Sequence, residues 1–288
     1  MAREGDRRAG PALERRSRIL SGGDPRSGVA IAVTSTVVVF ALIAVAVTHA
    51  PGWPEVKSTF FDWDEFKASL PEIAQAFKLN VKIFCIAEVF ILIFALLIAV
   101  MRSLPGPVFF PLRLLAIAYA DFFRGVPTIL VIAILGFGAP GLALTGVPTS
   151  VVFWATVALI LVYTAYVSEV YRAGIESVHP SQEAAARSLG LTRTQGLRYV
   201  ILPQAVRRVI PPLLNDFIGL QKDTALVGTL GAVEAFQQSQ IDTNATFNYT
   251  PYLAAALLFV AITIPLARFT DWLIARDRKR RQAAGVAA

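Results

Sequence analysis

Hydrophobic residues occur along this chain in blocks of about twenty, and polar residues gather between the blocks. A helix needs about 20 apolar residues to cross the hydrocarbon core of a bilayer, whereas a membrane-spanning strand alternates apolar and polar residues over about 10. The pattern therefore predicts an all-α polytopic membrane protein. We expect six transmembrane helices, at about residues 28–49, 73–101, 114–136, 150–170, 209–231 and 251–272.

Glycine and proline divide the longest uncharged stretch of the sequence. Residues Gly125 to Ser168 carry no charge, but six Gly and Pro residues between Gly136 and Pro148 interrupt them. These residues predict a hairpin between the third and fourth spans. Residues 51–72 contain two tryptophans and charges of both signs, a mixture typical of a segment at the membrane interface.

Lysine and arginine are distributed unevenly among the segments that join the spans. Residues 1–27 carry seven of them, 171–208 six and 276–288 five, whereas 137–149 and 232–250 carry none. Because positive residues are enriched on the cytoplasmic side, both termini and the 171–208 loop are predicted to be cytoplasmic. The expected organisation is a disordered basic tail at 1–27, an extra transmembrane helix at 28–50, an external interfacial segment at 51–72, a transmembrane domain at 73–275 and a basic tail at 276–288.

The composition agrees with a multi-pass protein of the cell membrane. The chain is 55% hydrophobic and 16% charged, whereas a soluble protein is usually about 25% charged. Its net charge is +7, but the cations lie at the ends of spans, so we expect membrane lipid and not nucleic acid as a partner. Cys85 is the only cysteine, and His49 and His179 are far apart, so neither a disulfide nor a metal site is expected.

The cytoplasmic loop contains the sequence EAAARSLGLTRTQGLRYVILPQA at residues 183–205. An Ala-rich helix is predicted to end at Gly190, which suits a left-handed C-terminal cap. Thr192 and Gln195 have the spacing of a capping box, so a second helix is expected to begin directly after Thr192. Pro203 is expected to interrupt or kink this second helix. The loop is therefore predicted to fold as helix, glycine corner, helix.

Two uses of such a loop follow from its residues alone. The loop can dock into the groove of a partner protein, because small alanines allow close approach and leucines offer an apolar ridge. It can instead lie on the lipid surface, held there by its arginines. The ridge consists of Leu189, Leu191 and Leu197, and the arginines are Arg187, Arg193 and Arg198.

The loop resembles the EAA motif of the permeases of bacterial ABC importers, which pairs EAA with a nearby glycine and ends in I-x-L-P. Here Gly190 is followed by nine residues and then by residues 200–203, VILP. Other segments resemble the polar amino acid permeases within that family, over about residues 70–275. The matches are Glu169, Arg172 and Gly174 to E-x-x-R-x-G; Tyr119, Arg124, Gly125 and Pro127 to Y-x4-R-G-x-P; and Asn215 with Lys222, Asp223, Thr224 and Leu226 to the segment after LPQA.

The sequence departs from the family pattern at one position of the loop. Counted back from Gly190, the family's glutamate falls on Ala184, and Glu183 lies one residue earlier. One residue is about 100° around a helix. Either Glu183 replaces the family glutamate from the neighbouring position, or that contact is lost.

The resemblance implies a transport subunit and not an enzyme. It implies a five-helix permease core, preceded here by an extra helix, that translocates a polar or charged amino acid of the glutamate, glutamine, arginine or histidine class. The implied partners are a cytoplasmic ABC ATPase dimer, a second permease subunit (the same chain or a paralogue) and an extracytoplasmic solute-binding protein. ATP and magnesium would bind the ATPase; no G-x4-G-K-[ST] motif occurs here, so we expect no cofactor on this chain. The residues implied to contact the ATPase are Glu183, Ala184, Ala185, Ala186, Leu189, Gly190, Leu191, Leu202 and Pro203.

Ionisable side chains within spans are functional candidates, because placing a charge in the bilayer is costly. Asp121 and Arg124 are three residues apart, as are Glu169 and Arg172, so each pair can meet on one helix face. Each pair is either a structural brace or part of a gate or subunit interface. Glu88 either holds the ammonium group of a substrate or is a paired or protonated carboxyl.

The predicted fifth span carries a polar stripe, which either lines the translocation path or a subunit interface, or makes structural hydrogen bonds. The stripe consists of Asn215, Asp216, Lys222, Asp223 and Thr224. The candidates for a gate, an interface or a pathway are this stripe and Tyr119, Asp121, Arg124, Pro127, Glu169 and Arg172.

Three other functions remain as alternatives. The first is an ABC importer permease for another small polar solute, since related permeases share the EAA loop. The second is an ion-coupled secondary transporter, which would need no ATPase; the absence of internal repeats argues against it. The third is a membrane-embedded enzyme, which would need a convergent catalytic set that the two distant histidines do not provide.

Overall fold

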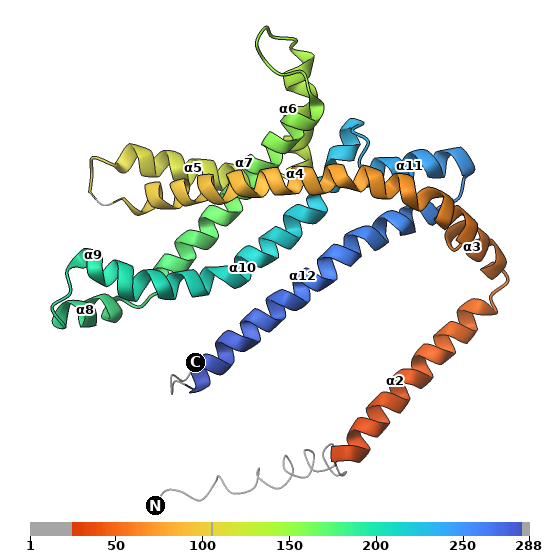
Figure 1. The fold of residues 1–288 in the computed structure, drawn as a ribbon, viewed down its shortest axis with the longest axis horizontal. Coiled ribbons are helices and arrows are strands. Elements are labelled where there is room, and N and C mark those ends of the chain that lie inside the picture. Colours follow the sequence, from red (N-terminus) through yellow and green to blue (C-terminus); the bar gives the residue numbers. More distant parts are fainter. Residues whose placement is uncertain (1–24, 105, 284–288) are drawn as a thin grey trace, which may run out of the picture. The chain divides into compact units, whose positions relative to one another are not determined.

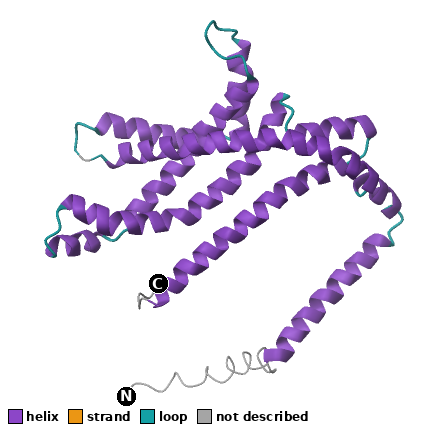
Figure 2. Ribbon diagram, viewed as in Figure 1, coloured by secondary structure: helices purple, strands orange, loops and turns teal. Residues whose placement is uncertain are grey.

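The computed structural model describes residues 25–104 and 106–283, and every regular element within them is helical (Figure 2). This confirms the predicted all-α class. Parts of both predicted basic tails, residues 1–24 and 284–288, lie outside the described residues. The elements are α2 Pro25–Thr48, α3 Trp53–Phe60, α4 Trp63–Ser103, α5 Phe110–Gly125, α6 Thr128–Gly141, α7 Val151–Glu176, α8 Pro180–Ser188, α9 Arg193–Gly196, the π-helix η1 Leu197–Ile201, α10 Leu202–Asp223, the 3₁₀ helix η2 Thr224–Leu230, α11 Ala235–Thr246 and α12 Thr250–Ala283 (Figure 1).

Four helical segments within the described residues are long and apolar enough to cross a membrane. They are Gly28–Thr48, Trp53–Ser103, Val151–Glu176 and Thr250–Arg276, and α5 with α6 makes a fifth if that bent pair counts as one span. These segments correspond to five of the six predicted spans and are those of a multi-pass membrane protein. The predicted span 209–231 is not among them, because α10 is too polar, so the count of six stays a prediction.

The third predicted span, 114–136, coincides with the pair α5 and α6 and is sharply bent. Helix α5 ends at Gly125, α6 begins at Thr128, and the two helices are bent by 99° at the break. Pro127 has no N–H, and it forces Val126 into an extended conformation with φ −95° and ψ 130°. The Val126 N–H caps α5 by donating to Phe122 O (3.1 Å), and Leu130 N–H starts α6 by donating to Pro127 O (2.9 Å).

Helix α4 is longer than the predicted second span. It runs for 41 residues from Trp63, where the Asp62 carboxylate accepts hydrogen bonds from the N–H groups of Asp64 and Glu65. At about 1.5 Å per residue it is roughly 60 Å long, about twice the thickness of the hydrocarbon core. The predicted interfacial segment is therefore helical, formed by α3 and the first turns of α4.

The core of residues 59–288 lies where α7 packs against α4, α6 and α10. Helix α4 contributes a buried stripe with one residue in every four, and each member of the stripe is isoleucine or alanine. Small residues let membrane helices approach closely, since packing and not water exclusion holds them together. The stripe is Ile83, Ala87, Ile91, Ala95 and Ala99, each at most 2% exposed.

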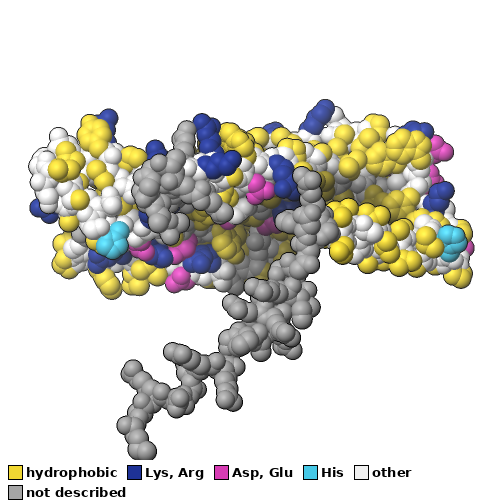
Figure 3. Space-filling view, turned by 90° about the horizontal axis from the view of Figure 1, so that it is seen from below, with side chains coloured by type: hydrophobic (Ala, Val, Ile, Leu, Met, Phe, Trp, Pro, Cys, Tyr) yellow, Lys and Arg dark blue, Asp and Glu magenta, His cyan; other side chains and the backbone are white. Residues whose placement is uncertain are grey.

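Residues 1–58 form a separate unit, of which the described part is mainly α2. From Gly28 to Thr48 every side chain of α2 is exposed, and most of them are apolar, as the yellow row ending near a histidine in Figure 3 shows. The hydroxyls of Thr36 and Thr48 donate to carbonyl oxygens one turn earlier in the same helix, both at 2.7 Å. A helix that satisfies its polar groups internally and exposes apolar side chains all round is suited to lipid.

Candidate functional site

The corner of the 171–208 loop has the geometry that the sequence predicts. Gly190 has φ +83°, the left-handed conformation that side chains disfavour. Its N–H donates to Arg187 O (3.0 Å), and the Leu191 N–H donates to Ala186 O (3.1 Å). These two bonds are a Schellman motif, which closes the end of α8.

The second helix of the loop begins with the predicted capping box. Thr192 Oγ1 accepts from the Gln195 N–H (3.3 Å), and Gln195 Oε1 accepts from the Thr192 N–H (2.9 Å). Two N–H groups that the helix cannot satisfy are thereby satisfied.

The regular α-helix is interrupted directly before Pro203 by the π-helix η1, but the chain stays helical. Helix α9 continues through η1 into α10, and the Leu202 N–H donates to Leu197 O, five residues back. The π-turn accommodates one extra residue, so Pro203 enters the first turn of α10, where its missing N–H costs little. The second loop helix and the predicted fifth span are therefore one helical rod, which begins well before residue 209.

The loop residues divide into an inner and an outer set. Ala186 is buried, and a Cβ atom at Gly196 would lie 3.5 Å from its methyl carbon, so it packs the two loop helices together. Leu189 is 83% exposed at the tip. Also exposed are Ala184, Ala185, Gly190, Leu202 and Pro203, while Glu183 and Leu191 are half-buried.

A cluster of charges beside the loop is centred on Glu169 of α7. Glu169 Oε2 lies 2.6 Å from Arg102 Nη1 of α4 and 3.8 Å from Arg124 Nη1 of α5. Glu169 Oε1 accepts from Arg172, which also pairs with Glu176. One carboxylate thus holds three helices together. The expected pair of Glu169 with Arg172 is present.

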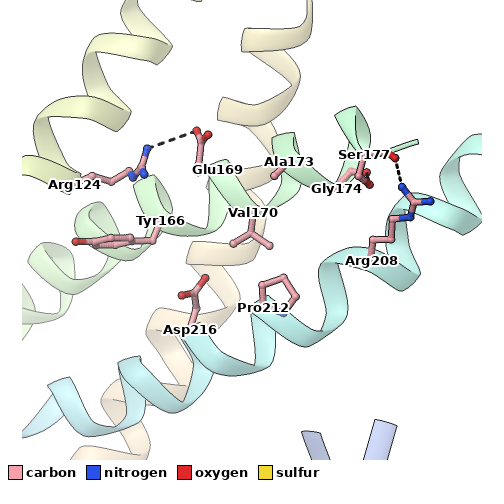
Figure 4. A pocket seen from close by; sticks show the side chains of 10 residues that line it. All are labelled: Arg124, Tyr166, Glu169, Val170, Ala173, Gly174, Ser177, Arg208, Pro212 and Asp216. Atoms are coloured by element: carbon pink, nitrogen blue, oxygen red, sulfur yellow. Dashed lines mark hydrogen bonds and ion pairs between the residues drawn. The ribbon is translucent and has the colours of Figure 1, made fainter. Parts of the chain in front are cut away.

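The expected pair of Asp121 with Arg124 was wrong. Arg124 turns to Glu169 instead, as the dashed line in Figure 4 shows, and Asp121 is exposed. Sequence analysis also missed Arg102, which lies at the end of α4. The only available signal was its place at the end of a span, and spacing along one helix says nothing about a partner on another helix.

Gly174, the glycine of E-x-x-R-x-G, lies where α7 crosses α10. A Cβ atom there would strike Val209 Cγ1 and would approach the carbonyl oxygen of Ala205 to 3.5 Å. The absence of a side chain therefore sets the distance between α7 and the rod that carries the loop.

We expect Gly174→Ala to destabilise the protein by about 1–3 kcal/mol, the usual cost of overpacking a fitted contact. Thermal unfolding of the detergent-purified chain would measure it. Gly125→Ala is the control, because no atom lies within 4 Å of the added Cβ. Equal unfolding temperatures for the two variants would contradict the close crossing.

A pocket of about 360 Å³ lies among α5, α7 and α10, next to the Glu169 cluster (Figure 4). Asp216 of α10 faces it, and its Oδ2 atom is buried and accepts no hydrogen bond. Arg208 also lines the pocket and donates to Ser177 O. The structure thus brings together Arg124, Glu169 and Asp216 from the candidates that the sequence named.

Other candidates lie elsewhere. Tyr119 Oη donates to Leu161 O (2.7 Å) and so ties α5 to α7, and Pro127 makes the bend. Asp223 accepts from Tyr163 Oη (2.9 Å), which gives it a structural hydrogen bond. Glu88 is half-buried on α4 and does not line this pocket; Asn215 and Lys222 are exposed.

A buried polar network lies at the C-terminal end of α10, and of its members only Thr224 was named from the sequence. Asn80 Nδ2 donates to Glu234 Oε2 (2.8 Å) and to Thr224 Oγ1 (3.2 Å), and Asn80 Oδ1 accepts from the Ala235 N–H (3.1 Å). Glu234 is fully buried, so burial raises the pKa of its carboxyl, while hydrogen bonds from Asn80 and from two N–H groups of α11 lower it. Asn80 lies between Lys78 and Lys82 in the first half of the second predicted span and Glu234 follows Gly228 and Gly231, and neither context marks a partner.

Among the described residues, no group of three His, Cys, Asp or Glu side chains could hold a metal ion.

Comparisons with known proteins agree on one kind of relative. The profile of a family described as binding-protein-dependent transport system inner membrane component matches residues 103–279. A probable amino-acid permease of Bacillus subtilis is 35% identical over 204 residues, covering 70% of this chain and 90% of the relative. A probable glutamine ABC transporter permease of the same organism is 37% identical over 63% of this chain and 82% of its own length. A glutamate/aspartate import permease of Escherichia coli is 32% identical over 77% and 99%.

Solved structures agree with these relatives. The structure titled as an amino acid ABC transporter with histidines superposes with a TM-score of 0.67 at 29% identity, covering 75% of this chain and 98% of that one. An inward-facing methionine ABC transporter superposes with a TM-score of 0.57 at 17% identity, over 71% and 95%, and shares the fold.

Proposed function

The chain belongs to the family of binding-protein-dependent transport system inner membrane components, and we propose that it is the permease subunit of an ATP-driven importer of polar or charged amino acids. It is a multi-pass membrane protein and a transport subunit, not an enzyme, in a family whose ATPase is a separate subunit. The observation that supports an amino acid substrate is that three similar permeases are named for amino acid transport: one for amino acids in general, one for glutamine and one for glutamate/aspartate.

The proposed contact with the ATPase is the outer face of the 171–208 loop. Ala184, Ala185 and Leu189 are exposed and small or apolar, as a helix that enters a protein groove requires. Leu189 is 83% exposed at a fixed corner, so its burial would contribute to docking. Glu183 lies half-buried at the edge of this face. ATP and magnesium belong to the partner, and we expect no cofactor on this chain.

The proposed translocation surface is the pocket among α5, α7 and α10. Asp216 offers a buried carboxylate oxygen without a hydrogen-bond partner, and Arg124 of α5 and Arg208 of α10 also line the pocket. A zwitterionic solute carries both charges, so a surface with both signs can bind each of its ends. A second permease subunit would close this open surface, and an external binding protein would deliver the solute.

The proposed topology has six spans with both termini in the cytoplasm. It takes α10 as the fifth span despite its polarity, because a helix that faces a path or another subunit need not be apolar all round. The additional helix α2 precedes a transmembrane domain at 73–275, and α11 then lies on the external side.

The test of this proposal is the capture of an ATPase. The tagged chain, purified from its native membrane, should retain an ATP-hydrolysing subunit and should restore uptake of labelled glutamine, glutamate, arginine or histidine in cells that lack it. Leu189→Asp should reduce ATPase retention at least tenfold, because docking would bury a carboxylate.

Leu144→Asp is the matched control, since Leu144 is 55% exposed in the α6–α7 hairpin, on the opposite side in the proposed topology. Its retention of the ATPase should equal that of the wild type. Absence of an ATPase from the wild-type preparation would exclude the importer, and a solute outside the amino acids would change its substrate.

A further inference from the structure

The buried network around Asn80 joins α4 to the end of α10 and the start of α11, about 150 residues further along the sequence. Asn80 belongs to α4, Thr224 ends α10, and Glu234 caps the start of α11. The Asn80 amide contacts both of the other segments, at 3.2 Å to Thr224, 2.8 Å to Glu234 and 3.1 Å to the Ala235 N–H. Any movement of α10 relative to α11 must therefore stretch or exchange one of these bonds.

Burying this polar network costs more desolvation free energy than burying an apolar contact of the same size. Asn80 is 2% exposed, and Thr224 and Glu234 are fully buried. No cation pairs with Glu234 in the part of the chain that the structure describes. Well-packed apolar side chains would hold helices together at a lower cost of desolvation. Directional hydrogen bonds at this position fix a geometry, which burial alone does not do.

The backbone between Thr224 and Glu234 leaves the regular α-helix. Helix α10 changes there into the seven-residue 3₁₀ helix η2, which is longer than the usual run of three or four residues. The Glu234 carboxylate packs directly against Gly228 of η2, and a Cβ atom at Gly228 would clash with Glu234 Oε1.

The cytoplasmic end of the same rod is the loop. Helices α9, η1 and α10 follow one another without a break from Arg193 to Asp223. A displacement of the loop would therefore act on Thr224 and on the amide of Asn80 through α10.

We propose that Asn80 and Glu234 are positioning residues that couple the movement of α10 to that of α11, so that the loop and the outer helix change state together. This rests on the proposed function, in which the loop contacts an ATPase and α11 lies outside. Neither residue lines the pocket among α5, α7 and α10, and neither belongs to the 171–208 loop.

The experiment separates coupling from folding by measuring two activities. Cells lacking the chain are complemented with each variant, and uptake of the labelled amino acid that the wild type restores is measured. ATP hydrolysis is measured on the complex purified through the tag. Asn80→Ala should lower uptake at least tenfold while hydrolysis per complex stays within about twofold, because the loop is intact. Ser69→Ala is the control on the same helix, since Ser69 is also buried but bonds only to its own helix at 2.9 Å.

A milder variant keeps the test decisive if Asn80→Ala does not accumulate. Thr224→Val removes only the hydroxyl that accepts the 3.2 Å bond from Asn80, and uptake should still fall at least threefold while hydrolysis stays within about twofold. Unchanged uptake in Asn80→Ala, a proportional fall of uptake and hydrolysis, or unchanged uptake in Thr224→Val would each overturn the proposal. A wild-type chain with no ATPase and no uptake would instead overturn the proposed function.

Discussion

Gly190→Val should abolish most amino acid uptake and most retention of the ATPase. Gly190 holds φ +83°, and a β-branched residue there costs about 2 kcal/mol or more. The loop can relieve that strain only by opening the Schellman bonds at Arg187 O and Ala186 O. At 1.4 kcal/mol per factor of ten, the docking-competent corner would fall about 30-fold in population. Uptake and ATPase capture from the same cells would measure the effect.

Gly190→Asn is the matched variant, because asparagine tolerates the left-handed conformation and also lacks a branched Cβ. No atom lies within 4 Å of a Cβ placed at this position, so space does not distinguish the two substitutions. The asparagine variant should keep most of the activity. If both variants lost uptake equally, the backbone conformation would not be what the ATPase recognises.

Local sequence rules were sufficient to predict the structure of the loop and the positions of the long apolar helices. The cap at Gly190 and the box at Thr192 and Gln195 each depend on bonds within a few residues, so the sequence alone predicted them. The bend at Pro127 was predictable from the same rule about proline, but the apolar run around it masked the break. At Pro203 the rule predicted an interruption or a kink, and the structure has a π-helix directly before the proline, through which the chain stays helical.

Partners on different helices could not be predicted from spacing. Arg124 was paired with Asp121 because both lie on α5, whereas the structure pairs it with Glu169 of α7. Arg102 and Asn80 were overlooked for the same reason, since each meets its partner more than 60 residues away in sequence. Polar residues within a span indicate that a partner exists, and only the packing of the helices identifies it.

Glu169→Gln should cause the largest loss of stability of any single change in the charge cluster. Arg102 is only 13% exposed, and Glu169 is its acceptor at 2.6 Å. A neutral amide would leave three guanidinium groups, of Arg102, Arg124 and Arg172, near one another without their shared anion. Removing one partner of a buried ion pair typically costs about 3–5 kcal/mol of stability. Because Glu169 is partly exposed, we expect a loss at the lower end, about 3 kcal/mol. Thermal unfolding of the purified chain would measure it, and α4, α5 and α7 should separate first in hydrogen exchange.

Two neighbouring carboxylates serve as controls for position. Glu176→Gln removes an acceptor of Arg172 whose side chain is 60% exposed, and exposed pairs are worth at most about 1 kcal/mol. Asp121→Asn should have no measurable effect, because Arg124 is bound to Glu169 and Asp121 faces outward. If Asp121→Asn destabilised the protein as much as Glu169→Gln does, the result would support the pairing of Asp121 with Arg124 that the sequence suggested. Because Glu169 joins α4, α5 and α7 at the end nearest the loop, its loss should also lower uptake by more than the fraction of unfolded protein accounts for.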